Sequence, residues 1–523
     1  MSTPVWQKVF AQGSSIVQYI DFFTMTAEKR LLSANMTLYT TCLWLPAPDF
    51  QASRIVCGVT SALTALMLAL WCSIAVSGGH SDGLVDPMKL GGSEYCGHCH
   101  TDIFQQWNAS THHFSSFNNP VYRKVVTDAI ERKGLPTFEF CARCHDPILK
   151  SSGETDKLDT NSWKANAGIT CLSCHRIMET SGGNGDYRIA EPTLHPFSLS
   201  DNPVLAKVHK TMIEITPWLH SNVLSKPLYS TPEYCATCHS ITVPAAINGV
   251  APMTFTDESG QLQRRHQNAH GEGLPGRCID CHMPDVPSKD PAAKDGLIRS
   301  HRFTGSNTAL PTFNRDLDQL EAVVAFLSSG IVDLRVAGVR TRHQDPFRPD
   351  EAVLVQAGDQ VEIAVEVHNA RAGHQFPTGT VDSNETWLSA VVTDASARSL
   401  TALGQLDAQG LIPADAIRFG TRYVDVFGNV TDRRNTTTDA VSIADDTVIP
   451  IRGRRTIFVK FTIPTDAVPP FTIDFTLNWR KYSPAFIDWV FDGRETLPLP
   501  VTTLARLHLT LPKTAVTTTA IPR

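Results

Sequence analysis

The sequence lacks an excess of basic residues and, beyond residue 75, lacks any cysteine outside a repeated motif. Its 46 lysines and arginines are outnumbered by 52 aspartates and glutamates, which gives a formal net charge of −6 at pH 7. Nucleic-acid-binding domains usually carry a basic patch or stripe, so this balance argues against nucleic acid as a partner. The lack of spare cysteines leaves no free thiol and no extra pair in that part of the chain.

The cysteines beyond residue 75 fall into five copies of Cys-x-x-Cys-His, the spacing that is typical of c-type haem attachment. Residues i, i+3 and i+4 share one face of a helical turn. Two thiols can therefore add to the porphyrin vinyl groups while the histidine reaches the iron from the same side. We expect five covalently bound c-type haems. The attaching cysteines are Cys96, Cys99, Cys141, Cys144, Cys171, Cys174, Cys235, Cys238, Cys278 and Cys281, and the proximal iron ligands are His100, His145, His175, His239 and His282.

Other uses of paired cysteines explain the motif less well. Structural zinc takes four ligands from paired half-sites and does not require a histidine after every second cysteine. Iron–sulfur clusters use a different cysteine spacing. A disulfide framework would leave the fixed histidine unexplained, and thiols committed to thioethers are protected from mispairing in an oxidising compartment.

The sixth ligand of each iron must come from histidines outside the motifs, of which the chain has enough to make every haem bis-histidine. The predicted distal ligands are His112 or its neighbour His113, His195, His209, His220 and His301. His266 and His270 are reserves in a Gly- and Gln-containing stretch. We expect His374, in a loop rich in glycine and proline, to brace a turn; the alternative is that it approaches the haem domain.

Residues 55–76 contain no charged side chain and are long enough to cross a bilayer as a helix. Arg54 precedes them, and the positive-inside rule then puts the haem region across the membrane from the N-terminus. We expect anchoring in the inner (plasma) membrane, with the haem domain in the periplasm or outside the cell. The alternative is a cleaved signal peptide, with Ala75-Val76-Ser77 at the cleavage site.

The expected fold class is a mainly α, loop-rich pentahaem domain followed by an antiparallel β-sandwich, with a single N-terminal transmembrane helix. Leu317, Leu320, Val324 and Leu327 form the apolar stripe expected of a helix over 314–330, and Gly330 is a stop signal. Apolar residues then alternate with polar ones over 361–367, 457–463 and 471–477, which predicts half-buried strands. The expected divisions are 1–54 (unassigned), 55–76 (anchor or signal), 77–92 (tether), 93–311 (haems), 312–344 (linker helix and connection) and 345–515 (sandwich).

The stretch from Cys96 through Trp107, Ser110 and His112 resembles the tetrahaem cytochromes of the ammonia-oxidation pathway and the wider hydroxylamine-oxidoreductase-like multihaem family. The resemblance implies that His112 ligates a neighbouring haem. Residues 300–309 and 373–379 resemble segments of multihaem cytochromes that carry a β-sandwich tail. Unlike the catalytic members, this chain has no haem motif ending in lysine, which argues against nitrite-reductase-type catalysis.

Two classes of function fit these features. The first is a membrane-anchored pentahaem cytochrome that transfers electrons in a respiratory chain, with redox proteins and quinol-linked membrane complexes as partners, and no catalytic residue is assigned to it. The second is an oxidoreductase that acts on a small nitrogen or sulfur compound at a five-coordinate haem. Direct quinol oxidation beside the membrane is a third possibility. Bis-histidine ligation throughout leaves no open iron, so it favours electron transfer.

Overall fold

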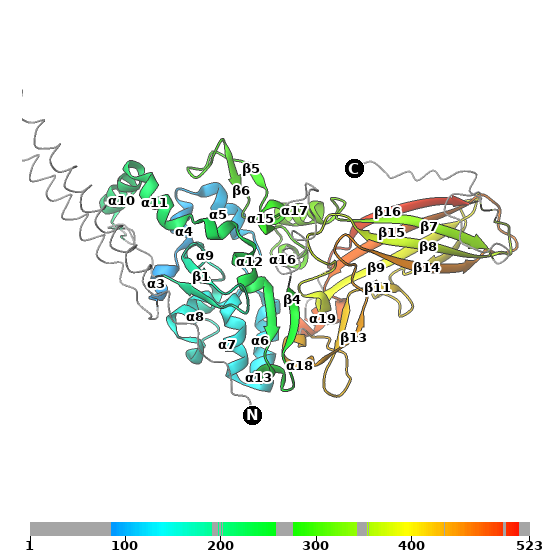
Figure 1. Cartoon of the computed structure of the whole chain (residues 1–523), viewed down its shortest axis with the longest axis horizontal. Coiled ribbons are helices and arrows are strands. Elements are labelled where there is room, and N and C mark those ends of the chain that lie inside the picture. Colours follow the sequence, from blue (N-terminus) through cyan, green and yellow to red (C-terminus); the bar gives the residue numbers. More distant parts are fainter. Residues whose placement is uncertain are drawn as a thin grey trace, which may run out of the picture. The chain divides into compact units, whose positions relative to one another are not determined.

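The computed structural model describes residues 85–190, 197, 200, 202–257, 276–341, 353, 355–433, 435–494 and 498–511. All of them belong to one compact unit, His80–Arg523. Short helices and loops form the first part of this unit, and long strands form the second (Figure 1).

The first part contains short α-helices joined by loops, 3₁₀ turns and small hairpins. The helices are α3 (Pro87–Leu90), α4 (Ser93–Gly97), α5 (Thr101–Asn108), α6 (Pro120–Lys133), α7 (Leu135–His145), α8 (Pro147–Ser152), α9 (Cys171–His175), α10 (Pro203–Ile215), α11 (Pro217–Leu224), α12 (Pro232–His239), α13 (Ala245–Asn248), α15 (Cys278–His282), α16 (Ala309–Phe313) and α17 (Leu317–Leu327). The 3₁₀ turns are η1 (Thr155–Lys157), η2 (Lys164–Asn166) and η3 (Pro227–Ser230). The antiparallel hairpins pair β1 (Ile177–Thr180) with β2 (Tyr187–Ile189), β3 (Ser240–Val243) with β4 (Met253–Asp257), and β5 (Asp285–Pro287) with β6 (Leu297–Arg299).

Caps and prolines determine where these helices begin. Asn119 precedes α6, and its side-chain oxygen accepts hydrogen bonds from the amides of Val121 (2.9 Å) and Tyr122 (3.4 Å). Pro120 occupies the first helical position, where its missing N–H costs nothing. Four of the five haem motifs then end their helices at the motif histidine, in α7, α9, α12 and α15. The local sequence therefore places each of these histidines at a helix end.

The second part is built from two antiparallel sheets. One has the order β10 (Ser399–Leu403), β9 (Asn384–Thr393), β15 (Phe471–Lys481) and β16 (Thr502–Leu511), with β11 (Ile417–Phe419) also paired to β9. The other has the order β14 (Arg454–Thr462), β8 (Gln360–Asn369) and β7 (Val332–Thr341). Smaller elements complete this part: η4 (Val381–Ser383), the paired strands β12 (Thr421–Val424) and β13 (Ser442–Asp446), and the helices α18 (Thr436–Asp439) and α19 (Pro484–Val490).

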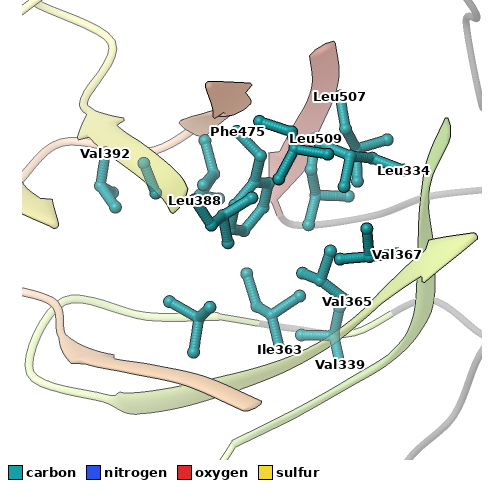
Figure 2. Packing of buried hydrophobic residues seen from close by; sticks show 14 of the residues in the cluster. Leu334, Val339, Ile363, Val365, Val367, Leu388, Val392, Phe475, Leu507 and Leu509 are labelled. Carbon is teal, nitrogen blue, oxygen red and sulfur yellow. The ribbon is translucent and has the colours of Figure 1, made fainter. Parts of the chain in front are cut away.

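The core of this second part lies between the two sheets. On β15, alternate residues from Phe471 to Trp479 are buried, as the two-residue period of a strand requires. Figure 2 shows Phe475, Leu388 and Leu509 facing Ile363 and Val365 across the space between the sheets. Phe475 is only 1% exposed. A dry sheet-on-sheet core of this kind makes the β part a rigid support.

The two parts pack against each other through α19 and α6. Phe486 and Ile487 of α19 are buried in one cluster with Val121 of α6 and Ala309 of α16. Ion pairs lie around this cluster, including Arg132 with Asp439 (2.7 Å) and Lys124 with Asp492 (2.5 Å). The apolar contact supplies most of the attraction, because partly exposed ion pairs contribute little.

The expected fold class needs correction. The described residues contain helix and strand in comparable amounts, so a mainly α chain is wrong. The hairpins β1 to β6 contribute short strands to the haem part, where little strand was expected. None of the helices in the described ranges is long and apolar enough to cross a membrane. This finding also overturns the expected transmembrane helix and the inner-membrane localisation that depended on it. The apolar run 55–76 lies outside the described residues.

Candidate haem-binding centre

One continuous cavity of 3120 Å³ runs through the helical part. Its volume is several times the roughly 300–1,000 Å³ of an ordinary small-molecule pocket. All ten motif cysteines and all five motif histidines line its wall. The cavity therefore has room for several large flat cofactors, and the groups that would attach them are already in place.

The motif histidines are oriented by hydrogen bonds from Nδ1. In four of them Nδ1 lies against an oxygen that accepts its hydrogen, so Nε2 is the unprotonated nitrogen that would bind a metal. The acceptors are Asp290 Oδ1 for His100 (2.8 Å) and the carbonyl oxygens of Ser115 for His145 (2.7 Å), Leu224 for His175 (2.7 Å) and Thr304 for His282 (2.7 Å). Such a second hydrogen bond is the usual companion of a metal-bound histidine.

Three motif histidines face a second histidine ring that the sequence predicted as a distal ligand. The ring centres are 6.1 Å apart for His100 and His220, 6.4 Å for His175 and His301, and 6.3 Å for His239 and His112. An imidazole nitrogen binds a metal at about 2 Å, so two imidazoles on opposite sides of one metal place their centres about 6 Å apart. Each pair therefore has the separation that one six-coordinate iron requires.

The planes of these ring pairs differ in a way that the same arrangement allows. The interplanar angle is 12° for His100 and His220 but 52° for His239 and His112. Rotation of one imidazole about the axis through both rings changes this angle without changing the separation. Both values are thus compatible with axial ligation of a single metal.

Burial keeps several of these imidazoles neutral, which is the form that binds a metal. Burial, together with the neighbouring His239, lowers the pKa of His112 to about 3. Burial and the neighbouring His282 lower the pKa of His239 to about 4, and burial and His175 lower the pKa of His301 to about 4. Protonation does not compete with metal binding at neutral pH at these positions.

The second motif has different surroundings. The ring of His145 lies beside that of Tyr122, at 4.6 Å between centres and 26° between planes. The Tyr122 hydroxyl donates to Asp146 Oδ2 at 2.5 Å. His195, a predicted distal ligand, lies outside the described residues, as do the reserves His266 and His270.

Thiols of different motifs approach one another inside the cavity. Cys96 lies within hydrogen-bonding reach of Cys171, and Cys235 within reach of Cys278. Cys144 and Cys238 form a third such pair. The attachment points of the first and third motifs, the second and fourth, and the fourth and fifth are therefore adjacent, although they are distant in sequence.

Two other predicted ligands lie elsewhere. His113 packs on Trp107 with 4.5 Å between ring centres, and its Nδ1 donates to the Asn108 carbonyl (2.9 Å). The structure therefore brings His112, and not His113, to a motif histidine. The buried ring of His209 lies against Tyr95, with 5.5 Å between ring centres.

Two residues of this centre were not among the predicted iron ligands. His374, for which we favoured a role in bracing a turn and kept an approach to the haem domain as the alternative, lies 6.4 Å from His282 with 16° between the planes. Asp290 hydrogen-bonds to His100 and has a fully buried side chain. A histidine or aspartate in a loop carries no local signal of what it contacts, and only proximity in the fold reveals these roles.

The described residues also bear on the zinc and disulfide alternatives. Within these ranges, no three or more His, Cys, Asp or Glu side chains gather closely enough to hold a metal ion by themselves. The ten motif thiols are all free of disulfides. Facing pairs of imidazoles leave four equatorial positions for a porphyrin, so the donor set fits haem and does not fit structural zinc.

The cavity, the paired thiols and the facing imidazoles together fit several covalently attached haems. A family model described as cytochrome c554 and c-prime matches residues 95–176. The penta-heme cytochrome c552 from Thermochromatium tepidum is similar in fold, with a TM-score of 0.50 and 18% sequence identity over 82% of this chain and 100% of that one. These findings support covalently bound c-type haems.

The remaining comparisons add no argument. The alkylpurine DNA glycosylase AlkC of Pseudomonas fluorescens, bound to DNA with an abasic site analog, matches with a TM-score of 0.12 and 7% identity, over 36% of this chain and 38% of that one. No curated protein matches the sequence. The broader resemblance to hydroxylamine-oxidoreductase-like proteins stays a prediction.

Proposed function

We propose that this protein is an electron-transfer cytochrome that holds five c-type haems and exchanges electrons with other redox proteins. The observation that carries the proposal is the single cavity, lined by every motif cysteine and histidine, in which imidazole rings face each other at the separation of one iron. A bound haem supplies one-electron redox chemistry at a potential that its ligands, hydrogen bonds and burial determine.

The side chains of this chain hold and orient the cofactors. The paired thiols would form thioether bonds to the haem vinyl groups, and the imidazole Nε2 atoms would bind the iron. The oxygens that accept from Nδ1 fix the ring planes, as the Leu224 carbonyl does for His175 and the Thr304 carbonyl for His282. An iron held by both imidazoles of a facing pair would have no place for a substrate, which favours electron transfer over catalysis.

The adjacency of attachment points supports transfer over distance within the protein. The fourth motif is adjacent to the second through Cys238 and Cys144, and to the fifth through Cys235 and Cys278. Cys174 Sγ of the third motif lies 2.7 Å from the hydroxyl of Tyr234, the residue that directly precedes Cys235 of the fourth. The attachment sites thus form one connected series rather than five isolated ones.

The first motif is the one nearest the surface. Cys99 is the one exposed thiol among the ten, all of which lie in the described ranges. A haem attached through an exposed cysteine would have an edge near the surface, so a partner protein could approach that haem closely without any part of the chain unfolding. We propose that redox partner proteins exchange electrons at this motif.

The haem count is the first test. Mass spectrometry of the matured protein should show five covalent haem additions, and the double change Cys141→Ala and Cys144→Ala should reduce them to four. A reductive titration should consume five electrons per chain. Carbon monoxide added to the reduced protein tests the enzyme alternative, because strong binding by the native protein reveals an open iron and contradicts pure electron transfer.

A further inference from the structure

His374 belongs to the β-sandwich but faces the haem cavity. It lies in the loop between β8, which ends at Asn369, and η4, which begins at Val381. This loop lines the same cavity as the motif residues. The His374 ring lies 6.4 Å from that of His282, with 16° between the planes, which is close to the geometry of His175 and His301 (6.4 Å and 17°).

The loop that carries His374 is held on both sides. The buried Asn369 donates from Nδ2 to the His374 carbonyl (2.8 Å) and accepts from the Ala372 amide (3.1 Å). Two residues after His374, Phe376 exchanges both backbone hydrogen bonds with Ile449 (2.9 and 2.7 Å). A ring carried by a backbone fixed in this way is preorganised, so little conformational entropy is lost when it binds a ligand.

The donor nitrogen is also selected. His374 Nδ1 lies 2.9 Å from the Gln375 carbonyl oxygen, which can only accept. Nδ1 therefore carries the hydrogen, and Nε2 is the nitrogen whose lone pair would bind a metal, as in His282. Phe326 of α17 packs beside His282 at 5.4 Å between ring centres and lines the same cavity.

The placement of His374 depends on how the two parts of the chain dock. The Trp479 indole of β15 donates to the Ser306 carbonyl across the boundary (3.2 Å), and Trp479 packs on Phe376 with 5.9 Å between ring centres. Arg371, three residues before His374, donates to the Ser329 carbonyl at the end of α17 (3.1 Å). These contacts hold the loop against the haem part.

We infer that His374 is the distal ligand of the iron whose proximal ligand is His282, so that the β-sandwich completes the fifth haem site. This inference rests on the proposed function. The sandwich is then part of a redox centre as well as a structural domain. An external ligand would then bind this iron only after His374 has moved away from it. The spin state of the iron would therefore report whether the sandwich is docked on the helical part.

The test uses the full-length haem-loaded protein with His374→Gly, which removes the ring. In the oxidised variant, about one fifth of the iron should change from low spin to high spin, because one of five haems loses a ligand. Electron paramagnetic resonance measures this change. Carbon monoxide should then bind one additional haem in the reduced form. Added imidazole should restore the low-spin signal, which a merely structural role of His374 would not allow.

The matched control is His508→Gly, which removes an exposed sandwich histidine whose Nδ1 hydrogen-bonds to Asp474 (2.7 Å). It should leave every spin signal unchanged. His374→Met should keep the iron six-coordinate but raise the potential of one haem, since methionine ligation raises haem potentials. An unchanged spectrum in His374→Gly, with five haems still attached, overturns the inference and leaves the proposed function intact. Absence of covalent haem in the wild-type protein overturns the proposed function itself.

Discussion

Asp290 should lower the potential of one haem, because its carboxylate is buried against the Nδ1 atom of His100. The side chain is fully buried, Oδ1 lies 2.8 Å from Nδ1, and Oδ2 has no hydrogen-bond partner among the residues that the structure describes. Nδ1 of the motif histidines His145, His175 and His282 instead donates to a neutral carbonyl oxygen. A negative charge stabilises the oxidised iron, so the haem on His100 should be the hardest of these to reduce.

The size of the effect follows from the geometry. The carboxylate would lie about 7 Å from the iron. This distance is the sum of the hydrogen bond to Nδ1, the width of the imidazole ring and a metal–nitrogen bond of about 2 Å. At an effective dielectric constant of about 20, unit charges at that distance interact by about 2.4 kcal/mol. Since a tenfold change in a one-electron equilibrium is about 59 mV, this energy corresponds to about 100 mV.

The perturbation is Asp290→Asn, which keeps an oxygen for Nδ1 and removes the charge. A spectroelectrochemical titration should show one of the five potentials raised by about 100 mV and the other four within about 20 mV of wild type. Asp285→Asn, at a 49% exposed side chain on β5, is the control and should change none of them. Five unchanged potentials in Asp290→Asn would refute the reasoning, as would an equal shift of all five.

Three further outcomes are expected. His112→Met should change the ligation of about one fifth of the haem iron in resonance Raman spectra, whereas His113→Met should change none, since only His112 faces a motif histidine. The pKa of Asp394 is lowered to about 2, first by its hydrogen bond with the Ser396 hydroxyl. The stabilisation from Asp394 is therefore present above about pH 4 and lost toward pH 2, so Asp394→Asn should lower Tm in calorimetry at pH 6 and match wild type near pH 2. Phe475→Ala should cost about 3–5 kcal/mol of unfolding free energy in denaturant titrations followed by circular dichroism, and Phe475→Leu less than about 1.5 kcal/mol; equal losses would contradict the packing argument.

Local patterns in the sequence predicted local structure well where one period dominates. The alternation over 361–367 falls within β8 and that over 471–477 within β15, and the alternation over 457–463 matches β14 except for Ile463, one residue past its end. The helix expected over 314–330 is shorter, since α17 spans Leu317–Leu327. Its buried face is also rotated from the expected one: Leu317 is 74% exposed, whereas Gln319 and Val323 are buried. Gln319 is buried because its side chain bonds to Arg302, a tertiary contact that helical periodicity does not reveal.

The choice between neighbouring histidines shows the same limit. His112 and His113 are adjacent and chemically identical, and both follow the same helix. Their side chains point to different surroundings, one toward His239 and the other onto Trp107. Sequence could therefore predict a ligand in this stretch and leave two candidates.

The sequence by itself determined the cofactor and one half of each site. Two thiols and a histidine at i, i+3 and i+4 are brought together by a single helical turn, whatever the rest of the chain does. Sequence offered candidates for the other half, and tertiary structure decided which histidine faces which motif. The histidines opposite the motifs come from distant segments, as His220 does for His100 and His374 for His282. The glycines and prolines around His374 predict a loop, but they do not predict which residues that loop contacts. Its position against His282 results from the docking of the sandwich on the helical part, which depends on packed surfaces that no short stretch of sequence contains.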